Sequence, residues 1–194
     1  NGVNRSERVE SELIIDKYGL HGNDYLCFLA RIVPEKGLTY LIDAFKQVKT
    51  DKKLVIAGGS SDTDDFAQEL MKRAKGDDRI VFTGFVQGQI LEELYSNAYL
   101  YTLPSDLEGM PLSLLEAMSY GNCCIVSDIA ECAEVVEDKA IVFKKSNVED
   151  LRQKIQELCD NPKIVQKYKK DAMNFICNKY NWDKVVRSTL ELYR

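Results

Sequence analysis

The sequence predicts an α/β fold with a doubly wound, parallel, six-stranded sheet, followed by helices at the C-terminal end of the chain. Short apolar runs alternate with amphipathic stretches up to residue 143, and hairpin turns do not join them. Strands that alternate with helices in this way pair in parallel through helical crossovers. The runs are also continuously apolar, which is typical of strands that are covered on both faces of the sheet.

The expected strands are short runs rich in apolar and β-branched residues. They lie at residues 25–30, 53–57, 79–83, 98–103, 122–127 and 140–143. The helices expected between them carry their apolar residues on one stripe. They lie at residues 38–48, 64–75, 89–96 and 111–120. Pro111 stands at the start of the last of these helices, where its missing N–H costs nothing, and Gly121 is typical of the residue that follows a helix.

Three more helices are predicted after residue 145. Ser146 and Glu149 have the spacing of a capping box, which opens a helix that ends near residue 159. Asn161 and Pro162 begin a second helix that reaches about residue 178, and a last amphipathic segment covers residues 182–193. Because such parallel sheets bind ligands outside the carboxyl ends of their strands, we expect a site in the loops after the first four strands.

The composition excludes several classes of protein. The chain has 194 residues, of which 45% are hydrophobic and 29% charged, and this is typical of a globular protein rather than a disordered one. A net charge of −5 argues against general nucleic-acid binding, and no stretch approaches the roughly 20 apolar residues that span a bilayer. The single histidine, His21, excludes a zinc site built on several histidines, and we expect it in a surface turn.

The six cysteines indicate a reducing compartment. None belongs to a C-x-x-C pair, and Cys123 and Cys124 are adjacent inside an apolar run. Buried thiols fit this pattern best, with a disulfide framework or a metal site as the alternatives. The chain begins Asn1-Gly2-Val3 without a visible signal peptide. We therefore expect a cytoplasmic protein, and a fragment of a longer polypeptide.

Two cations follow the first expected strand. Arg31 and Lys36 lie five residues apart in the loop at residues 30–37, at the ligand-binding end of the sheet. An arginine forks onto phosphate oxygens, and a lysine acts as a mobile point charge. The pair therefore suits a diphosphate, and the alternative is that both are solvated loop charges.

Two carboxylates flank the start of the helix after the fourth strand. Glu108 lies in the loop, and Glu116 lies eight residues later, where its side chain tilts back toward the helix N-terminus. We expect free N–H groups at residues 109, 110, 112 and 113 to favour an anion there. A carboxylate also suits a vicinal diol, so cations and acids together describe a nucleotide sugar. The alternative is an ordinary loop acid and an ordinary helix-face acid.

These motifs belong to a longer series of matching segments. In chain order the segments are residues 1–3, 29–37, 55–59, 81–86, 108–116, 127–136 and 180–182. In this order they resemble the C-terminal, donor-binding domain of retaining GT-B glycosyltransferases of family 4 (glycosyl transferases group 1). The resemblance covers nearly the whole chain. Two departures from it are Ala30, where many members have glycine, and residues 130–133 in place of Gly-Gly-x-Pro.

The resemblance implies a role for each matching residue. Arg31 and Lys36 would hold the donor diphosphate and stabilise the charge that grows on the leaving group, Glu108 would face the donor sugar, and these three would be catalytic. Glu116 would bind the ribose hydroxyls, and residues 84–86 would lie beside the base. The substrate-binding residues that it implies are Gly59, Gly84, Phe85, Val86, Gly109, Met110, Pro111, Leu112 and Glu116. No metal or other cofactor is implied.

The resemblance also implies a domain organisation. Residues 1–180 would form a Rossmann-like nucleotide-sugar-binding domain, and residues 181–194 a helix that crosses to an N-terminal acceptor domain missing here. The full enzyme would move a hexosyl group from a UDP or GDP sugar to a saccharide or lipid-linked acceptor with retention of configuration, as in polysaccharide biosynthesis. The fragment alone would be inactive, and nucleic acid is not an expected partner.

Two alternative functions stay open on the sequence. One is a GT-B-fold epimerase or phosphorylase, and the other is a non-catalytic nucleotide-sugar-binding or interaction module. The basic residues between 152 and 170 indicate a solvated helix face. The alternative is a weak docking surface for anionic lipid, which would place the full-length protein at the inner membrane surface.

Overall fold

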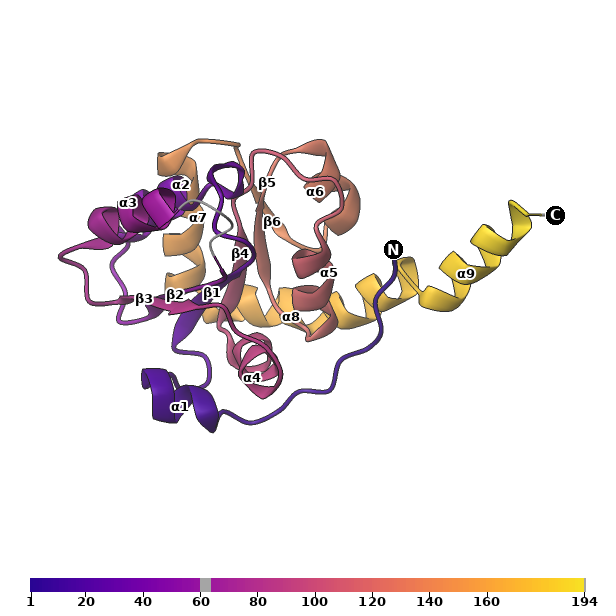
Figure 1. Cartoon of the computed structure of the whole chain (residues 1–194), viewed down its shortest axis with the longest axis horizontal. Coiled ribbons are helices and arrows are strands. Elements are labelled where there is room, and N and C mark those ends of the chain that lie inside the picture. Colours follow the sequence, from indigo (N-terminus) through magenta and orange to yellow (C-terminus); the bar gives the residue numbers. More distant parts are fainter. Residues whose placement is uncertain (60–63, 194) are drawn as a thin grey trace.

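A computed structural model describes residues 1–59 and 64–193 of the chain. The described residues form one parallel sheet in the strand order β3-β2-β1-β4-β5-β6 (Figure 1). The strands are β1 (Tyr25–Leu29), β2 (Lys53–Ala57), β3 (Ile80–Gly84), β4 (Leu100–Leu103), β5 (Cys124–Ser127) and β6 (Ile141–Phe143). All six expected strands are therefore confirmed. The apolar runs form strands because β1, β4 and β5 lie in the interior of the sheet, where helices bury both of their faces.

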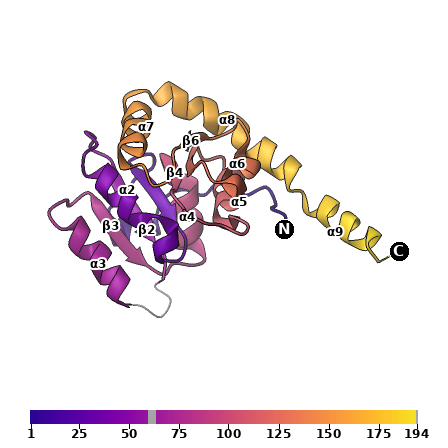
Figure 2. The ribbon, with the colours of Figure 1, turned by 90° about the horizontal axis from the view of Figure 1, so that it is seen from above.

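Helices cover the two faces of this sheet. They are α1 (Leu13–Tyr18), α2 (Leu38–Phe45), α3 (Asp64–Ala74), α4 (Gln89–Asn97), α5 (Leu112–Ser119), α6 (Ala130–Val136), α7 (Val148–Asp160), α8 (Pro162–Lys179) and α9 (Trp182–Glu191). Helices α2, α3 and α7 gather on one face (Figures 1 and 2), and α1 and α4 lie on the other (Figure 1). Helix α9 extends away from the rest of the molecule, and none of its residues is buried.

Two of these helices, α1 and α6, were not expected from the sequence. Helix α1 has only six residues, and its start depends on a distant side chain. The buried carboxylate of Glu93 in α4 accepts the N–H groups of Glu12 and Ile14 through Oε2, both at 3.0 Å. These bonds satisfy two backbone donors that a helix N-terminus leaves open. A tertiary contact, rather than local sequence, thus stabilises α1.

The predicted capping box at the start of α7 is wrong by one residue. Asn147 is the capping residue, and its side chain accepts the N–H of Asp150 at 2.9 Å. Ser146 instead has a positive φ of 59° and donates its hydroxyl to Asp106 at 2.9 Å. Asparagine caps a helix as well as serine does. The chain therefore uses Asn147 and leaves Ser146 to bind the loop after β4.

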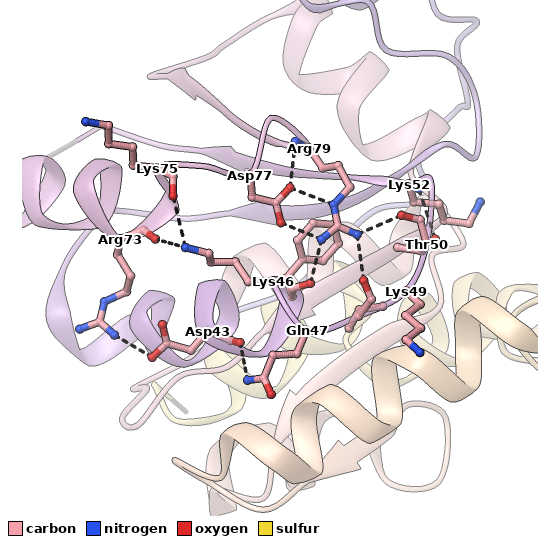
Figure 3. Close-up of polar contacts among 12 residues, drawn as sticks. Asp43, Lys46, Gln47, Lys49, Thr50, Lys52, Arg73, Lys75, Asp77 and Arg79 are labelled. Atoms are coloured by element: carbon pink, nitrogen blue, oxygen red, sulfur yellow. Dashed lines mark hydrogen bonds and ion pairs between the residues drawn. The ribbon is translucent and has the colours of Figure 1, made fainter.

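The side chain of Arg79 joins the amino end of β3 to the end of α2 and the turn that follows it. Its guanidinium donates to the carbonyl oxygens of Val48 and Thr50 at 2.9 and 3.0 Å, and to both carboxylate oxygens of Asp77 at 2.7 and 2.9 Å (Figure 3). The same group stacks over the Phe45 ring, 4.8 Å from its centre. Arg79 thereby satisfies carbonyl groups in the turn that follows α2. The Arg79 guanidinium also lowers the pKa of Asp77.

The six cysteines carry free thiols, and Cys27, Cys123, Cys124 and Cys132 are buried. Cys124 is the first residue of β5 and Cys123 directly precedes it, and both lie inside the core. Burial raises the pKa of Cys123 and of Cys132, each to about 12. These side chains therefore pack as small apolar groups and keep their protons at neutral pH.

We predict that Arg79→Lys destabilises the fold by about 2 kcal/mol, because lysine keeps the charge but loses the planar fork that serves several acceptors. Urea denaturation of the 194-residue chain measures this loss. The matched control is Arg73→Lys, since Arg73 pairs with Asp43 at 2.7 Å in a more exposed position. That change should cost less than about 1 kcal/mol. Equal losses in the two variants would contradict the role given to Arg79.

The buried thiol of Cys123 predicts a loss of stability at alkaline pH. An unfolded cysteine releases its proton near pH 8.5, whereas the folded chain keeps this proton to about pH 12. The contribution of Cys123 to the free energy of unfolding is therefore complete below about pH 8.5 and falls as the pH rises. In Cys123→Ala, the free energy of unfolding should decline between pH 9 and 10.5 less steeply than in the wild-type chain, by up to about 1.4 kcal/mol per pH unit. Urea melts at several pH values test this, and identical slopes would refute it.

Candidate functional site

A cavity of about 540 Å³ opens at the carboxyl ends of the strands. It lies beside β1, where the strand order reverses, because β2 and β3 continue to one side of β1 and β4 to the other. In doubly wound sheets this is the place where ligands bind. The loops after β1, β2 and β3 line the cavity together with α4 and α5. The lining residues are Leu29, Ala30, Arg31, Gly58, Gly59, Phe85, Val86, Gln87, Leu91, Tyr95, Leu112, Ser113 and Glu116.

Close backbone contacts fix the loops around this cavity. A Cβ atom on Gly58 would lie 1.9 Å from the carbonyl oxygen of Ala30, so only glycine lets the β1 and β2 loops approach this closely. Gly37 has a φ of +68°, and a Cβ there would lie 2.0 Å from the carbonyl oxygen of Pro104. This second contact brings the β1 loop against the loop that follows β4. The N–H of Asp106 then donates to the carbonyl oxygen of Glu35 at 2.8 Å.

Arg31 and Glu116 both line the cavity, as the sequence predicted for a shared ligand. Arg31 follows β1, and Glu116 lies in the middle of α5. Both residues are exposed, and Tyr95 from α4 donates its hydroxyl to Glu116 Oε2 at 3.0 Å. The cavity therefore carries a cation from the β1 loop and a carboxylate from α5, with the apolar groups of Leu29, Val86 and Leu91 among its other lining residues.

Lys36 and Glu108 form a buried ion pair. Lys36 Nζ lies 2.6 Å from Glu108 Oε1, and the exposed fractions of the two side chains are 13% and 5%. The hydroxyl of Ser105 donates to the same carboxylate oxygen at 2.6 Å. Neither member of the pair lines the cavity. Because breaking a buried pair leaves an uncompensated charge, Lys36 and Glu108 hold each other in fixed positions in this structure.

The structure brings together half of the residues that the sequence analysis proposed for the site. Those that line the cavity are Arg31, Gly59, Phe85, Val86, Leu112 and Glu116. Those outside the lining are Lys36, Gly84, Glu108, Gly109, Met110 and Pro111. Gly84 is the last residue of β3, and Gly109 and Met110 are exposed in the loop before α5. Tyr95 and Gln87 also line the cavity and were not predicted from the sequence, whereas Ser113 was expected near the ligand through its N–H group.

One expectation about the start of α5 is wrong. The N–H of Leu112 donates to the carbonyl oxygen of Met110 at 2.8 Å. It is therefore not free to bind an anion, as the position of Pro111 had suggested. The turn forms because Pro111 is the capping residue and the helix begins one residue later than expected, at Leu112.

The described ranges, 1–59 and 64–193, carry neither a metal-binding cluster nor a helix that could span a membrane. They contain no group of three or more histidine, cysteine, aspartate or glutamate residues arranged to hold a metal ion. No helix among them has the length and hydropathy that crossing a bilayer requires.

Comparison with known proteins places the chain among glycosyltransferases. Residues 10–175 match the family described as Glycosyl transferases group 1. The chain is 30% identical over 173 residues to the uncharacterized glycosyltransferase MJ1607 of Methanocaldococcus jannaschii. The aligned region covers 87% of this chain and 44% of that protein. The chain is 24% identical to the O-antigen chain mannosyltransferase B of Escherichia coli, over 93% of this chain and 48% of that protein.

A solved structure shows the same fold. The crystal structure of Anabaena Alr3699/HepE in complex with UDP and glucose aligns with a TM-score of 0.85 and 18% identity, over 93% of this chain and 51% of that one. This likeness confirms the expected Rossmann-like fold of a GT-B glycosyltransferase domain. The chain spans about half the length of the relatives that it matches.

The contact of Gly37 with Pro104 predicts a sharp effect of one methyl group. Gly37→Ala should destabilise the chain by more than the roughly 1–2 kcal/mol that a left-handed backbone costs alanine, because the new Cβ also overlaps a backbone oxygen. Gly76→Ala is the matched control, since Gly76 has a φ of +88° and open space around it. Thermal and urea denaturation measure both losses. If the two variants lose equal stability, the packing of the two loops does not depend on Gly37.

Proposed function

The chain belongs to the glycosyl transferases group 1 family, and from this premise we propose that it is the donor-binding half of a retaining hexosyltransferase. The donor is a nucleoside diphosphate sugar, and the rest of the enzyme supplies the acceptor site. The enzyme moves the sugar to a saccharide or lipid-linked acceptor. The proposal rests above all on one observation, namely that Arg31 and Glu116 line the same cavity at the carboxyl edge of the sheet.

The chemistry of the cavity fits the parts of such a donor. A guanidinium forms paired hydrogen bonds with phosphate oxygens, so Arg31 suits the diphosphate. The carboxylate of Glu116 accepts hydrogen bonds and suits the two hydroxyls of a ribose. The same lining includes Gly59, Phe85 and Val86. Phe85 has 72% of its surface exposed, and this apolar surface suits the face of a base.

The names of similar proteins support the same donor class. The Anabaena protein was crystallised with UDP and glucose, and the Escherichia coli relative is a mannosyltransferase. Both names refer to transfer or binding of a hexose. We therefore propose UDP or GDP as the nucleotide of the donor, with a hexose as the transferred sugar.

The ion pair of Lys36 and Glu108 suggests how the reacting end of the donor is held. As the bond between the sugar and the diphosphate breaks, negative charge grows on the phosphate oxygens. Arg31 and Lys36 are placed on one loop, and their charges would stabilise this leaving group without a metal ion. Glu108 keeps Lys36 in position at 2.6 Å and would face the donor sugar.

The exposed face of α9 supports a second domain. Trp182, Val186 and Leu190 lie four residues apart along this helix, and each has 42% or more of its surface exposed. Water-exposed apolar residues on one side of a helix mark a contact with another surface. We propose that residues 181–194 cross to the acceptor-binding half, as relatives twice as long would allow.

Titration calorimetry of the 194-residue chain with UDP, GDP and ADP tests the proposed donor class. We expect at least one of them to bind with a dissociation constant below 1 mM. Arg31→Ala and Glu116→Gln should each weaken that binding about tenfold or more, because each removes hydrogen bonds to a charged group. Failure of all three nucleotides to bind would contradict the proposal.

Matched controls for this titration come from the far end of α9. Arg187→Ala and Glu191→Gln make the same changes in charge outside the cavity, and both residues are exposed. They should leave the dissociation constant unchanged. If they weaken binding as much as the cavity variants do, net charge and not the cavity governs the affinity.

A further inference from the structure

A buried tyrosine lies directly against the carboxylate of Glu116. Tyr95 extends from α4 and has only 2% of its surface exposed. Its hydroxyl donates to Glu116 Oε2 at 3.0 Å and also lies 3.4 Å from the carbonyl oxygen of Ser113. Both acceptors belong to α5. Tyr95 therefore connects α4 to Glu116 in α5, although it lies 21 residues before Glu116 in the sequence.

The ring of Tyr95 is fixed by other aromatic side chains. It stacks on Tyr120 with 5.3 Å between ring centres and 15° between ring planes, and it lies 6.1 Å from Tyr101 at a tilt of 42°. The hydroxyl of Tyr101 in turn donates to Ser113 Oγ at 2.8 Å. Burial raises the pKa of Tyr95 well above its usual value, and the charges of Tyr101 and Glu116 add to this effect. The hydroxyl therefore stays a donor at any working pH.

This arrangement limits how Glu116 can move. A glutamate on an exposed helix face samples several rotamers, and a carboxylate that swings freely is a poor partner for two hydroxyls at once. The bond from Tyr95 holds Oε2 and restricts the rotation of the carboxylate. Glu116 Oε1 is then the oxygen left without this bond, on a residue that lines the cavity.

We propose that Tyr95 is a positioning residue, which orients Glu116 for the ribose hydroxyls and so makes the site prefer ribonucleotides. This inference rests on the proposed function, because it assumes that a nucleoside diphosphate occupies the cavity. It assigns no contact between Tyr95 and the ligand. Its specific consequence is that removal of the Tyr95 hydroxyl weakens the recognition of ribose and leaves the recognition of base and phosphate intact.

The test compares each ribonucleotide with the analogue that lacks both ribose hydroxyls. The probes are UDP, GDP and ADP and their 2′,3′-dideoxy forms, titrated into the wild-type chain and into Tyr95→Phe. Phenylalanine keeps the ring that stacks on Tyr120 and removes only the hydroxyl. We expect the preference of the wild-type chain for the ribose form to fall about tenfold or more in the variant, the size of one hydrogen bond to a charged group. The affinity for the dideoxy form should stay the same.

Two further variants separate positioning from general damage. Tyr99→Phe removes another buried tyrosine hydroxyl, which donates to the carbonyl oxygen of Leu158 at 2.7 Å and does not line the cavity. It should leave the ribose preference unchanged. The double variant Tyr95→Phe with Glu116→Gln should show no smaller preference than Glu116→Gln alone, because Tyr95 acts only through Glu116.

The outcomes distinguish this inference from the proposed function. If the wild-type chain binds no nucleotide, the proposed function fails, and the inference fails with it. If the wild-type chain binds and prefers the ribose form, but Tyr95→Phe keeps the same preference, the inference alone is overturned. If Tyr95→Phe weakens the binding of the ribose form and of the dideoxy form equally, the inference is also overturned, because that pattern indicates a structural role only.

Discussion

The sheet reverses its winding direction at β1, and the position of the cavity depends on this reversal. The chain passes from β1 to β2 and β3 on one side and then returns to β4 on the other side. In doubly wound sheets a ligand cavity lies at such a reversal, and the cavity of this chain lies beside β1. Gly58 and Gly37 bring the neighbouring loops within backbone contact of the β1 loop. The fold thus places Arg31, from the β1 loop, and Glu116, from the helix that follows β4, in the lining of one cavity.

The charged side chains at and near this cavity are of two kinds, exposed and ion-paired. Arg31 and Glu116 are exposed and line the cavity, so water or a ligand solvates them. Lys36 and Glu108 are mostly removed from water and neutralise each other at 2.6 Å. Removal of one member of such a pair would leave an uncompensated charge. Of the two cations of the β1 loop, Arg31 thus lines the cavity, and Lys36 is paired outside its lining.

The sequence predicted those features that local pattern determines. The six strands were predicted because strands buried on both faces must be continuously apolar, and Arg31 and Glu116 were predicted because they follow strands whose carboxyl ends share one edge. Contacts between distant residues were beyond such patterns. The short helix α1 depends on Glu93, and the role of Tyr95 depends on the packing of α4 against α5. Asn147 replaced Ser146 as a cap because two good capping residues stand side by side, and the pattern does not rank them.

The most direct test of the cavity's role is a crystal structure of the 194-residue chain with UDP-glucose. We expect the diphosphate within hydrogen-bond distance of the Arg31 guanidinium, the ribose hydroxyls on Glu116, and the base beside Phe85 and Val86. A nucleotide bound elsewhere on the chain, or bound in the cavity with its ribose directed away from Glu116, would contradict the assignment of this cavity as the donor site.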